Sequence, residues 1–126
     1  MLSDHDTSAM IPVKDLEKSR RWYEDVLGLT PVIDEPSGIT YKSGAGVFSI
    51  YPTQFLGAKH TLMGWVVPDI EAAVGELASK GITFEQYDFE GLKTDGRGIA
   101  ELEGERGAWF KDPDGNILSV WQSTTT

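Results

Sequence analysis

One short pattern occurs twice in this sequence of 126 residues. The first copy begins at 13–17 (VKDLE) and ends at 28–30 (GLT), and the second begins at 67–71 (VPDIE) and ends at 81–83 (GIT). The capping aspartates of the two copies are 54 positions apart and the closing glycines 53 apart. Each copy combines an extended run, a helix-capping Asp, an amphipathic stretch, a helix-stopping Gly and a β-prone restart. The repeat therefore predicts a strand–helix–strand unit used twice.

Further β-prone runs, separated by turns rich in Gly and Pro, complete each copy. We expect helices over 16–27 and 70–80 and strands over 8–14, 29–34, 39–42, 46–52, 61–67, 82–87, 107–111 and 117–122. The stretch 88–106 departs from the repeat, because it is long and rich in Gly and charged residues, and it leaves room for a short extra strand at 99–102.

These elements predict an α+β fold of two βαβββ modules related by a pseudo-twofold axis. Each module is a curved sheet covered by one helix, and the two sheets form an incomplete barrel around a cleft. We expect a single domain over 1–126, with a first module at about 8–52, a linker at 53–60 and a second module at about 61–122.

Composition excludes several classes of function. The formal charge of −9 repels phosphate backbones, so we expect no nucleic-acid partner. No apolar run approaches the roughly 20 residues that span a membrane, and the first eight residues do not form a secretory signal. The sequence contains no cysteine, which excludes disulfides and thiolate sites and suits a cytoplasmic location.

Two segments of this sequence resemble a known family. The segments 13–19 (VKDLEKS), 22–23 (WY) and 27–29 (LGL) resemble the entry of a vicinal oxygen chelate domain, and 110–118 (FKDPDGNIL) resembles its closing hairpin. This is the glyoxalase / bleomycin-resistance / extradiol dioxygenase superfamily, and the resemblance covers residues 8–122. The family includes metal lyases, epimerases, dioxygenases and drug-binding proteins, so the resemblance implies a fold more than an activity.

The resemblance also implies where a metal would bind. Enzymes of the family use a His seven residues before each capping Asp and a Glu on the last strand of each module. In this sequence those positions are Ser8, Leu62, Ser49 and Ser119. Hydroxyls are poor ligands for transition metals and leucine is none, so we expect no metal and no cofactor. Of the two histidines, His5 would aim at the opposite face, whereas His60 could reach only the rim.

The strand period of two turns these positions into a map of the cleft. Together with the four metal-ligand positions, further residues are expected to face the cleft, namely Met10, Pro12, Val47, Tyr51, Gly64, Val66, Ile117 and Trp121. Residues expected under the helices are Ile11, Val13, Phe48, Ile50, Met63, Trp65, Leu118 and Val120. Tyr41 and Trp109 are also expected to reach the cleft, although a bulge would change their phase.

The candidate ligand-binding residues are thus Tyr41, Ser49, Tyr51, Leu62, Trp109, Ser119 and Trp121. This set favours a metal-independent protein that binds a small apolar or aromatic molecule in the cleft and is not an enzyme. An alternative is a lyase, isomerase or dioxygenase with a non-standard metal site or a metal-free acid/base pair such as Glu101 with Tyr51. A third is an interaction module with no ligand, in which these aromatic residues only fill the core or a dimer interface. The resemblance further implies a homodimer.

Overall fold

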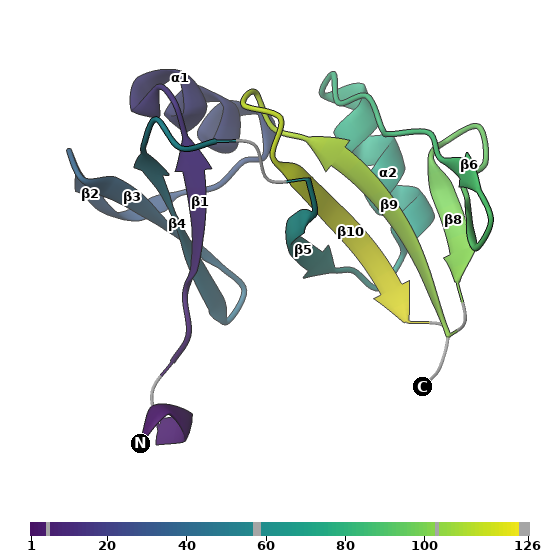
Figure 1. Ribbon diagram of the computed structural model, residues 1–126, viewed down its shortest axis with the longest axis horizontal. Coiled ribbons are helices and arrows are strands. Elements are labelled where there is room, and N and C mark those ends of the chain that lie inside the picture. The colour runs from purple at the N-terminus through teal and green to yellow at the C-terminus, as the bar shows by residue number, and fades with distance from the viewer. Residues whose placement is uncertain (5, 57–58, 103, 124–126) are drawn as a thin grey trace. The chain divides into compact units, whose positions relative to one another are not determined.

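The computed structural model describes residues 1–4, 6–56, 59–102 and 104–123. The chain forms two compact units, Met1–Gly57 (unit 1) and Ala58–Thr126 (unit 2). Each unit contains one four-stranded sheet and one main helix (Figure 1). His5 and Glu103 lie outside the described residues.

Unit 1 contains one sheet with the strand order β1-β4-β3-β2. Its elements are η1 (Leu2–Asp4), β1 (Ala9–Val13), α1 (Leu16–Arg21), η2 (Trp22–Val26), β2 (Pro31–Glu35), β3 (Gly38–Ser43) and β4 (Gly46–Pro52). Strand β1 runs parallel to β4, and the other neighbours are antiparallel. The short 3₁₀ turn η1 was not expected from the sequence, whereas the order strand, helix and three strands was.

The helix of unit 1 begins and ends as its sequence indicates, but it changes type on the way. The Asp15 side chain accepts a 3.1 Å hydrogen bond from the Lys18 N–H and so caps α1. From Trp22 to Val26 the helix widens into the π-helical turn η2, in which the Leu27 N–H donates to the Trp22 carbonyl (3.3 Å). Gly28 then takes a positive φ of 73°, which ends the helix.

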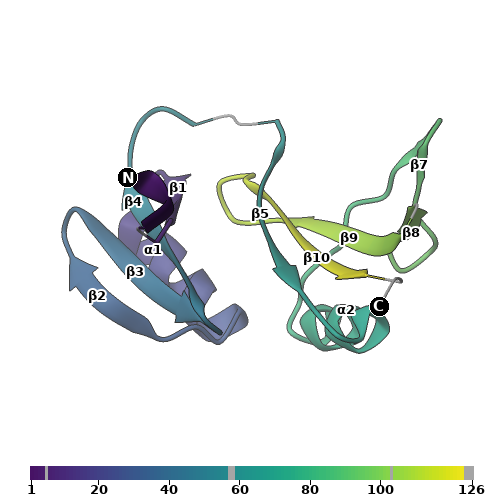
Figure 2. The same cartoon turned by 90° about the horizontal axis from the view of Figure 1, so that it is seen from below.

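Unit 2 also contains one four-stranded sheet, with the order β5-β10-β9-β8. Its elements are β5 (Thr61–Val66), α2 (Ile70–Ser79), β6 (Asp88–Phe89), β7 (Leu92–Lys93), β8 (Ile99–Leu102), β9 (Glu105–Lys111) and β10 (Ile117–Ser123). Strand β5 runs parallel to β10, and the remaining pairs are antiparallel. Figure 2 shows α2 beneath this sheet, with β7 extending from the β8 end on the side away from α2.

The strand expected over 82–87 is not formed, and this prediction was wrong. Phe84 makes only an isolated bridge to Phe110. The edge of β9 next to this segment is already paired with β8 over residues 105–108, so only the end of β9 is left for the 82–87 segment. The short extra strand expected at 99–102 therefore supplies the second strand of this module, and the βαβββ order is kept with the small hairpin β6–β7 inserted.

The helix of unit 2 is held at its start by two acceptors. The Asp69 side chain accepts from the Ala72 N–H (3.1 Å), and the Gln122 Oε1 atom of β10 accepts from the Ile70 N–H (2.8 Å). Two of the orphan N–H groups of the first turn are thus satisfied, one of them by the sheet that the helix covers. Gly81, with a φ of 94°, follows the end of the helix.

The core of each unit lies between its helix and its sheet. In unit 1 the fully buried side chains include Ile11, Val13, Tyr23, Ile39, Tyr41 and Ile50, and in unit 2 they include Ile70, Phe110 and Leu118. The predicted α+β class with two βαβββ modules is therefore confirmed, and the barrel is not closed. In the described part of the chain, no helix is long and apolar enough to cross a membrane.

Candidate functional site

Two serines occupy the same place in the two units. Ser49 lies on the central strand β4 between Met10 of β1 and Thr40 of β3, and Ser119 lies on the central strand β10 between Gly64 and Trp109. The residues that alternate with these serines are buried against the helices, namely Phe48, Ile50, Leu118 and Val120. Both serines therefore face away from the helix, on what we call the open face of each sheet.

The open face of unit 1 is mainly aliphatic. The Ser49 hydroxyl lies 2.7 Å from the Thr40 Oγ1 atom, so the two side chains bond to each other. Around this pair Met10 is 56% exposed, Ile33 50% and Val47 37%. Tyr51, two residues beyond Ser49, is half-buried and lies beside Gly38. This face thus exposes apolar area around a pair of hydroxyls that bond to each other.

The open face of unit 2 carries two tryptophan rings that lie over glycine positions. A Cβ atom at Gly107 would meet the Trp109 ring at 3.2 Å, and a Cβ atom at Gly64 would meet the Trp121 Cδ1 atom at 3.5 Å. The Ser119 Oγ atom would lie only 2.4 Å from that same Cβ at Gly64. The two glycines thus give room for both indoles and for the Ser119 hydroxyl. We call Gly64, Gly107, Trp109, Ser119 and Trp121 the aromatic platform.

Tyr41 does not lie on an open face, which corrects the expected phase. It pairs with Phe48 across β3 and β4, is fully buried, and stacks on Tyr23 with ring centroids 6.1 Å apart. Its hydroxyl donates a 3.0 Å hydrogen bond to the Glu24 carboxylate. Burial, together with that bond, raises the pKa of Tyr41 well above its ordinary value. Tyr41 therefore stabilises the core beneath the helix and is not part of the candidate site.

The other positions of interest lie near the strand starts. Ser8 is exposed and precedes β1. Leu62 is half-buried and sits where the β5–β10 register shifts, because Ile117 pairs with Thr61 and the next pair is Leu118 with Met63. His60 is exposed just before β5. Only Ser49 and Ser119 of the four positions are thus placed on the open faces by the strand registers.

These residues do not fit a divalent transition metal. The Ser49 hydroxyl is bonded to Thr40, and the Ser119 hydroxyl packs over a glycine. Within the described ranges, no three His, Cys, Asp or Glu side chains are grouped closely enough to hold a metal ion. The donor set that such metals need is imidazole, thiolate or carboxylate, and the two serines offer none of these.

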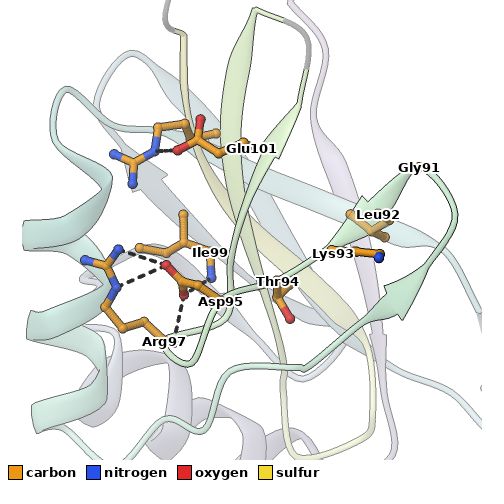
Figure 3. A pocket seen from close by; sticks show the side chains of 9 residues that line it. Gly91, Leu92, Lys93, Thr94, Asp95, Arg97, Ile99 and Glu101 are labelled. Carbon is orange, nitrogen blue, oxygen red and sulfur yellow. Dashed lines mark hydrogen bonds and ion pairs between the residues drawn. The ribbon is translucent and has the colours of Figure 1, made fainter.

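A separate charged hollow lies at the edge of the unit 2 sheet (Figure 3). Its volume is about 600 Å³, and its lining residues are Gly91, Leu92, Lys93, Thr94, Asp95, Arg97, Ile99, Glu101 and Arg106. The charged groups are largely paired: Arg97 with Asp95 and with Glu71 of α2, and Arg106 with Glu101 at 2.8 Å. Glu101 therefore forms an ion pair on the helix side of β8.

The ion pairs of this hollow lower the pKa of two carboxyl groups. The Arg97 guanidinium holds the pKa of Glu71 below its ordinary value. Partial burial would raise the pKa of Asp95, but the bonds it accepts from Arg97 and from the Ile99 N–H lower it overall. Both carboxylates are thus kept charged near neutral pH. The network ties the turn before β8 to the first turn of α2.

The sequence profile of the glyoxalase/bleomycin resistance protein/dioxygenase superfamily matches residues 7–120. The chain belongs to this superfamily. The match spans both units and most of the described chain, so the superfamily resemblance expected from the two sequence motifs is confirmed. No protein with a curated description matches the sequence.

Solved structures of superfamily members have the same fold. A glyoxalase family protein from Enterococcus faecalis is 21% identical, with a TM-score of 0.71, and the match covers 96% of this chain and 99% of that one. A glyoxalase/bleomycin resistance protein/dioxygenase from Alicyclobacillus acidocaldarius is 18% identical, with a TM-score of 0.69 and coverages of 96% and 92%.

A third solved structure is TnmS3, an antibiotic binding protein from Streptomyces sp. CB03234. It is 17% identical with a TM-score of 0.70, and the match covers 98% of this chain and 99% of that one. Identities this low establish the fold of the superfamily and leave the ligand of this member to its own residues.

Sequence reasoning missed the glycines of the platform as a feature and did not include Tyr87. The Tyr87 ring packs against Trp109 with centroids 5.7 Å apart at 64°. The signal for the glycines was available, because Gly64 falls in phase with Leu62 and Gly107 in phase with Trp109. The position of Tyr87 had no such signal, since the strand expected to carry it is not formed.

Proposed function

We propose that this superfamily member binds a small apolar or aromatic molecule on the aromatic platform of unit 2, without a metal and without catalysis. The observation that carries this proposal is that two indoles and the Ser119 hydroxyl lie over glycine positions on the same open face. An indole face offers a large apolar stacking surface, and one hydroxyl beside it offers a hydrogen bond that orients a ligand.

The surroundings of the platform support the same reading. Val66, which pairs with Trp121, is 67% exposed, so the apolar surface continues along β5. The formal charge of −9 favours a cationic ligand over an anionic one. The antibiotic binding protein TnmS3, which shares the fold, shows that the superfamily fold is compatible with binding a small molecule. The missing imidazole and carboxylate donors support a site that works without a metal.

The test is to titrate the protein with 4-phenylbenzylamine, a cationic aromatic probe, and to measure its binding by calorimetry. Replacing Trp121 or Trp109 with Ala should weaken binding by about 1–3 kcal/mol, because a buried stacking surface is lost. The matched control is Tyr51→Ala in unit 1, which lies two residues beyond Ser49 as Trp121 lies two beyond Ser119. Equal affinity of all variants would refute the platform, as would no binding by the parent protein.

Metal independence and assembly need separate measurements. Elemental analysis should find no stoichiometric metal, and a chelator should leave probe binding unchanged. A turnover activity that disappears on chelation would instead favour the enzymatic alternative. We also propose a cytoplasmic location, because the sequence contains no cysteine, and a homodimer, on the strength of the superfamily resemblance alone. Sedimentation that gives only a 13.9 kDa species at high concentration would contradict the dimer.

A further inference from the structure

The segment before β8 carries two more aromatic rings to the platform. The Glu85 N–H donates a 2.7 Å hydrogen bond to the Trp109 carbonyl, which places the segment beside the end of β9. Two residues later, the Tyr87 ring meets the Trp109 ring edge-on, with centroids 5.7 Å apart. Phe89 follows, with its ring 5.7 Å from that of Tyr87 and tilted by 39°. Trp109, Tyr87 and Phe89 thus form a continuous row of rings.

Tyr87 is held in place from the other side of the hairpin as well. Its N–H donates to the Thr94 Oγ1 atom (2.9 Å), and its carbonyl accepts from the Thr94 N–H (2.9 Å). Thr94 in turn bridges to Ala100 of β8, so it is tied to the main sheet. Because Glu85 is bonded to β9 and Tyr87 itself to Thr94, the Tyr87 ring is positioned in advance and need not be ordered by a ligand.

Phe89 is the exposed end of this row. Its side chain is 56% exposed at the tip of β6, and the hairpin extends on the side of the sheet away from α2 (Figure 2). The sheet packs its helix on the other side, so folding of the core does not account for this ring. An exposed phenyl group continuous with two further rings is the kind of apolar patch that marks a binding surface.

We propose that Tyr87 and Phe89 determine specificity by extending the platform, so that it selects cationic ligands with two linked aromatic rings over ligands with one. One ring of such a ligand stacks on the Trp109 and Trp121 side, and the second lies along Tyr87 towards Phe89. The proposal rests on the proposed function, since it names the class of ligand that the same site takes. The negative charge of the chain accounts for the preference for a cation.

The experiment compares the Kd values of benzylamine and 4-phenylbenzylamine, which share one ammonium group and differ by one ring. The parent protein should bind the two-ring probe about ten-fold more tightly, the effect expected of one added aromatic contact. Phe89→Ala and Tyr87→Ala should each reduce that ratio to about two- or three-fold and leave benzylamine binding nearly unchanged. Tyr87→Phe, which keeps the ring, should retain the full ratio.

The control variant is Phe55→Ala, which removes an 89% exposed phenyl group from unit 1 and should leave the ratio unchanged. A third probe, 4-cyclohexylbenzylamine, has similar apolar size but a non-aromatic second ring, and it should gain less than the biphenyl compound. Because Phe89 is exposed, its loss should not affect folding, which circular dichroism will verify.

The outcomes separate this inference from the proposed function. If Trp109→Ala and Trp121→Ala weaken both probes but the ratio is the same in Phe89→Ala, Tyr87→Ala and the parent, the platform binds ligands and the extension is wrong. If no probe binds, both proposals are wrong. A ratio that falls only in the two hairpin variants supports the extension.

Discussion

The open faces of the two sheets begin from the same plan and differ in what surrounds the central serine. In unit 1, Ser49 lies between Met10 and Thr40, and its hydroxyl bonds to a neighbouring side chain on the same sheet. In unit 2, Ser119 lies between Gly64 and Trp109, and its hydroxyl rests over a bare backbone position. The repeat thus sets where the serines lie, but their strand neighbours set the surface that each face presents.

This difference indicates a division of roles between the units. A serine that bonds within its own sheet contributes to stability, because both hydroxyls of the pair are satisfied internally. A serine beside two indoles on glycine positions contributes a polar point to an aromatic surface. The helix-covered faces differ in a parallel way: Tyr41 of unit 1 and Phe110 of unit 2 occupy equivalent positions opposite Phe48 and Leu118, and only the first bears a hydroxyl.

The largest effect is expected from a methyl group at Gly64. Gly64→Ala should destabilise the protein by about 1–3 kcal/mol, because the new Cβ would lie 2.4 Å from the Ser119 Oγ atom. Met10 is the position of unit 1 that is equivalent to Gly64. Met10→Ala removes a 56% exposed side chain and should lower the free energy of unfolding by less than about 1 kcal/mol. Urea denaturation measures both. In a Ser119→Ala background Gly64→Ala should cost less, and an unchanged cost would show that the oxygen is not the obstacle.

Tyr41→Phe makes the helix side of unit 1 resemble that of unit 2. It should cost about 1 kcal/mol at neutral pH, since the bond to Glu24 is lost. Because folding raises the pKa of Tyr41, its contribution is present below about pH 10 and is lost as the pH rises through the raised value. The variant should therefore lose less stability than the parent in alkaline solution. Parallel stability curves for the two proteins would contradict this assignment.

The two serines should respond differently to removal of the hydroxyl. Ser49→Ala leaves the Thr40 hydroxyl without the bond it makes at 2.7 Å and should cost about 0.5–1.5 kcal/mol. Ser119→Ala removes a hydroxyl that lies over Gly64, where there is no Cβ, and should cost less than Ser49→Ala. Denaturant midpoints of the two variants decide the order, and the reverse order would mean that the faces do not divide the roles as described.

The smallest effects are expected from the ion pairs that join each helix to its own unit. The Arg20 side chain holds the pKa of Asp34 below its ordinary value in unit 1, and Arg97 does the same for Glu71 in unit 2. A lowered pKa gives stability that is present above about pH 4–5 and lost as the pH falls through the lowered value. Asp34→Asn and Glu71→Gln should therefore each make the melting temperature fall slightly less steeply as the pH is lowered. A slope identical to that of the parent would refute the contribution.

Local sequence signals predicted most of the fold but only part of the site. The caps at Asp15 and Asp69 and the stops at Gly28 and Gly81 are local, and all four are found in the structure. The strand period also placed the central serines on the open faces. The expectation that Tyr41 reaches the cleft was wrong, although the sequence around the turn could have corrected it. The hairpin pairs Ser43 with Gly46, and counting back from that pair places Tyr41 opposite Phe48, on the helix side of the sheet.

The rest could not be read from local patterns. The 82–87 segment has the composition of a strand, but a strand needs a free edge, and β8 occupies most of the edge of β9. That competition is decided by residues about 15–20 positions further along the chain. Because the 82–87 segment does not pair as a strand, Tyr87 and Phe89 lie outside the four-stranded sheet and form the row of rings beside Trp109.

The π-helical turn at Trp22–Val26 also explains a small irregularity in the repeat. Thirteen positions separate Asp15 from Gly28, but only twelve separate Asp69 from Gly81. A wider turn takes up one additional residue while leaving the cap and the stop in place. The two copies of the repeat thus differ by a single-residue insertion or deletion that is confined to one turn of helix. The strands on either side keep their pairing. One added residue within a strand would move its side chains to the other face of the sheet, whereas the added residue in this helix leaves the architecture of the repeat unchanged.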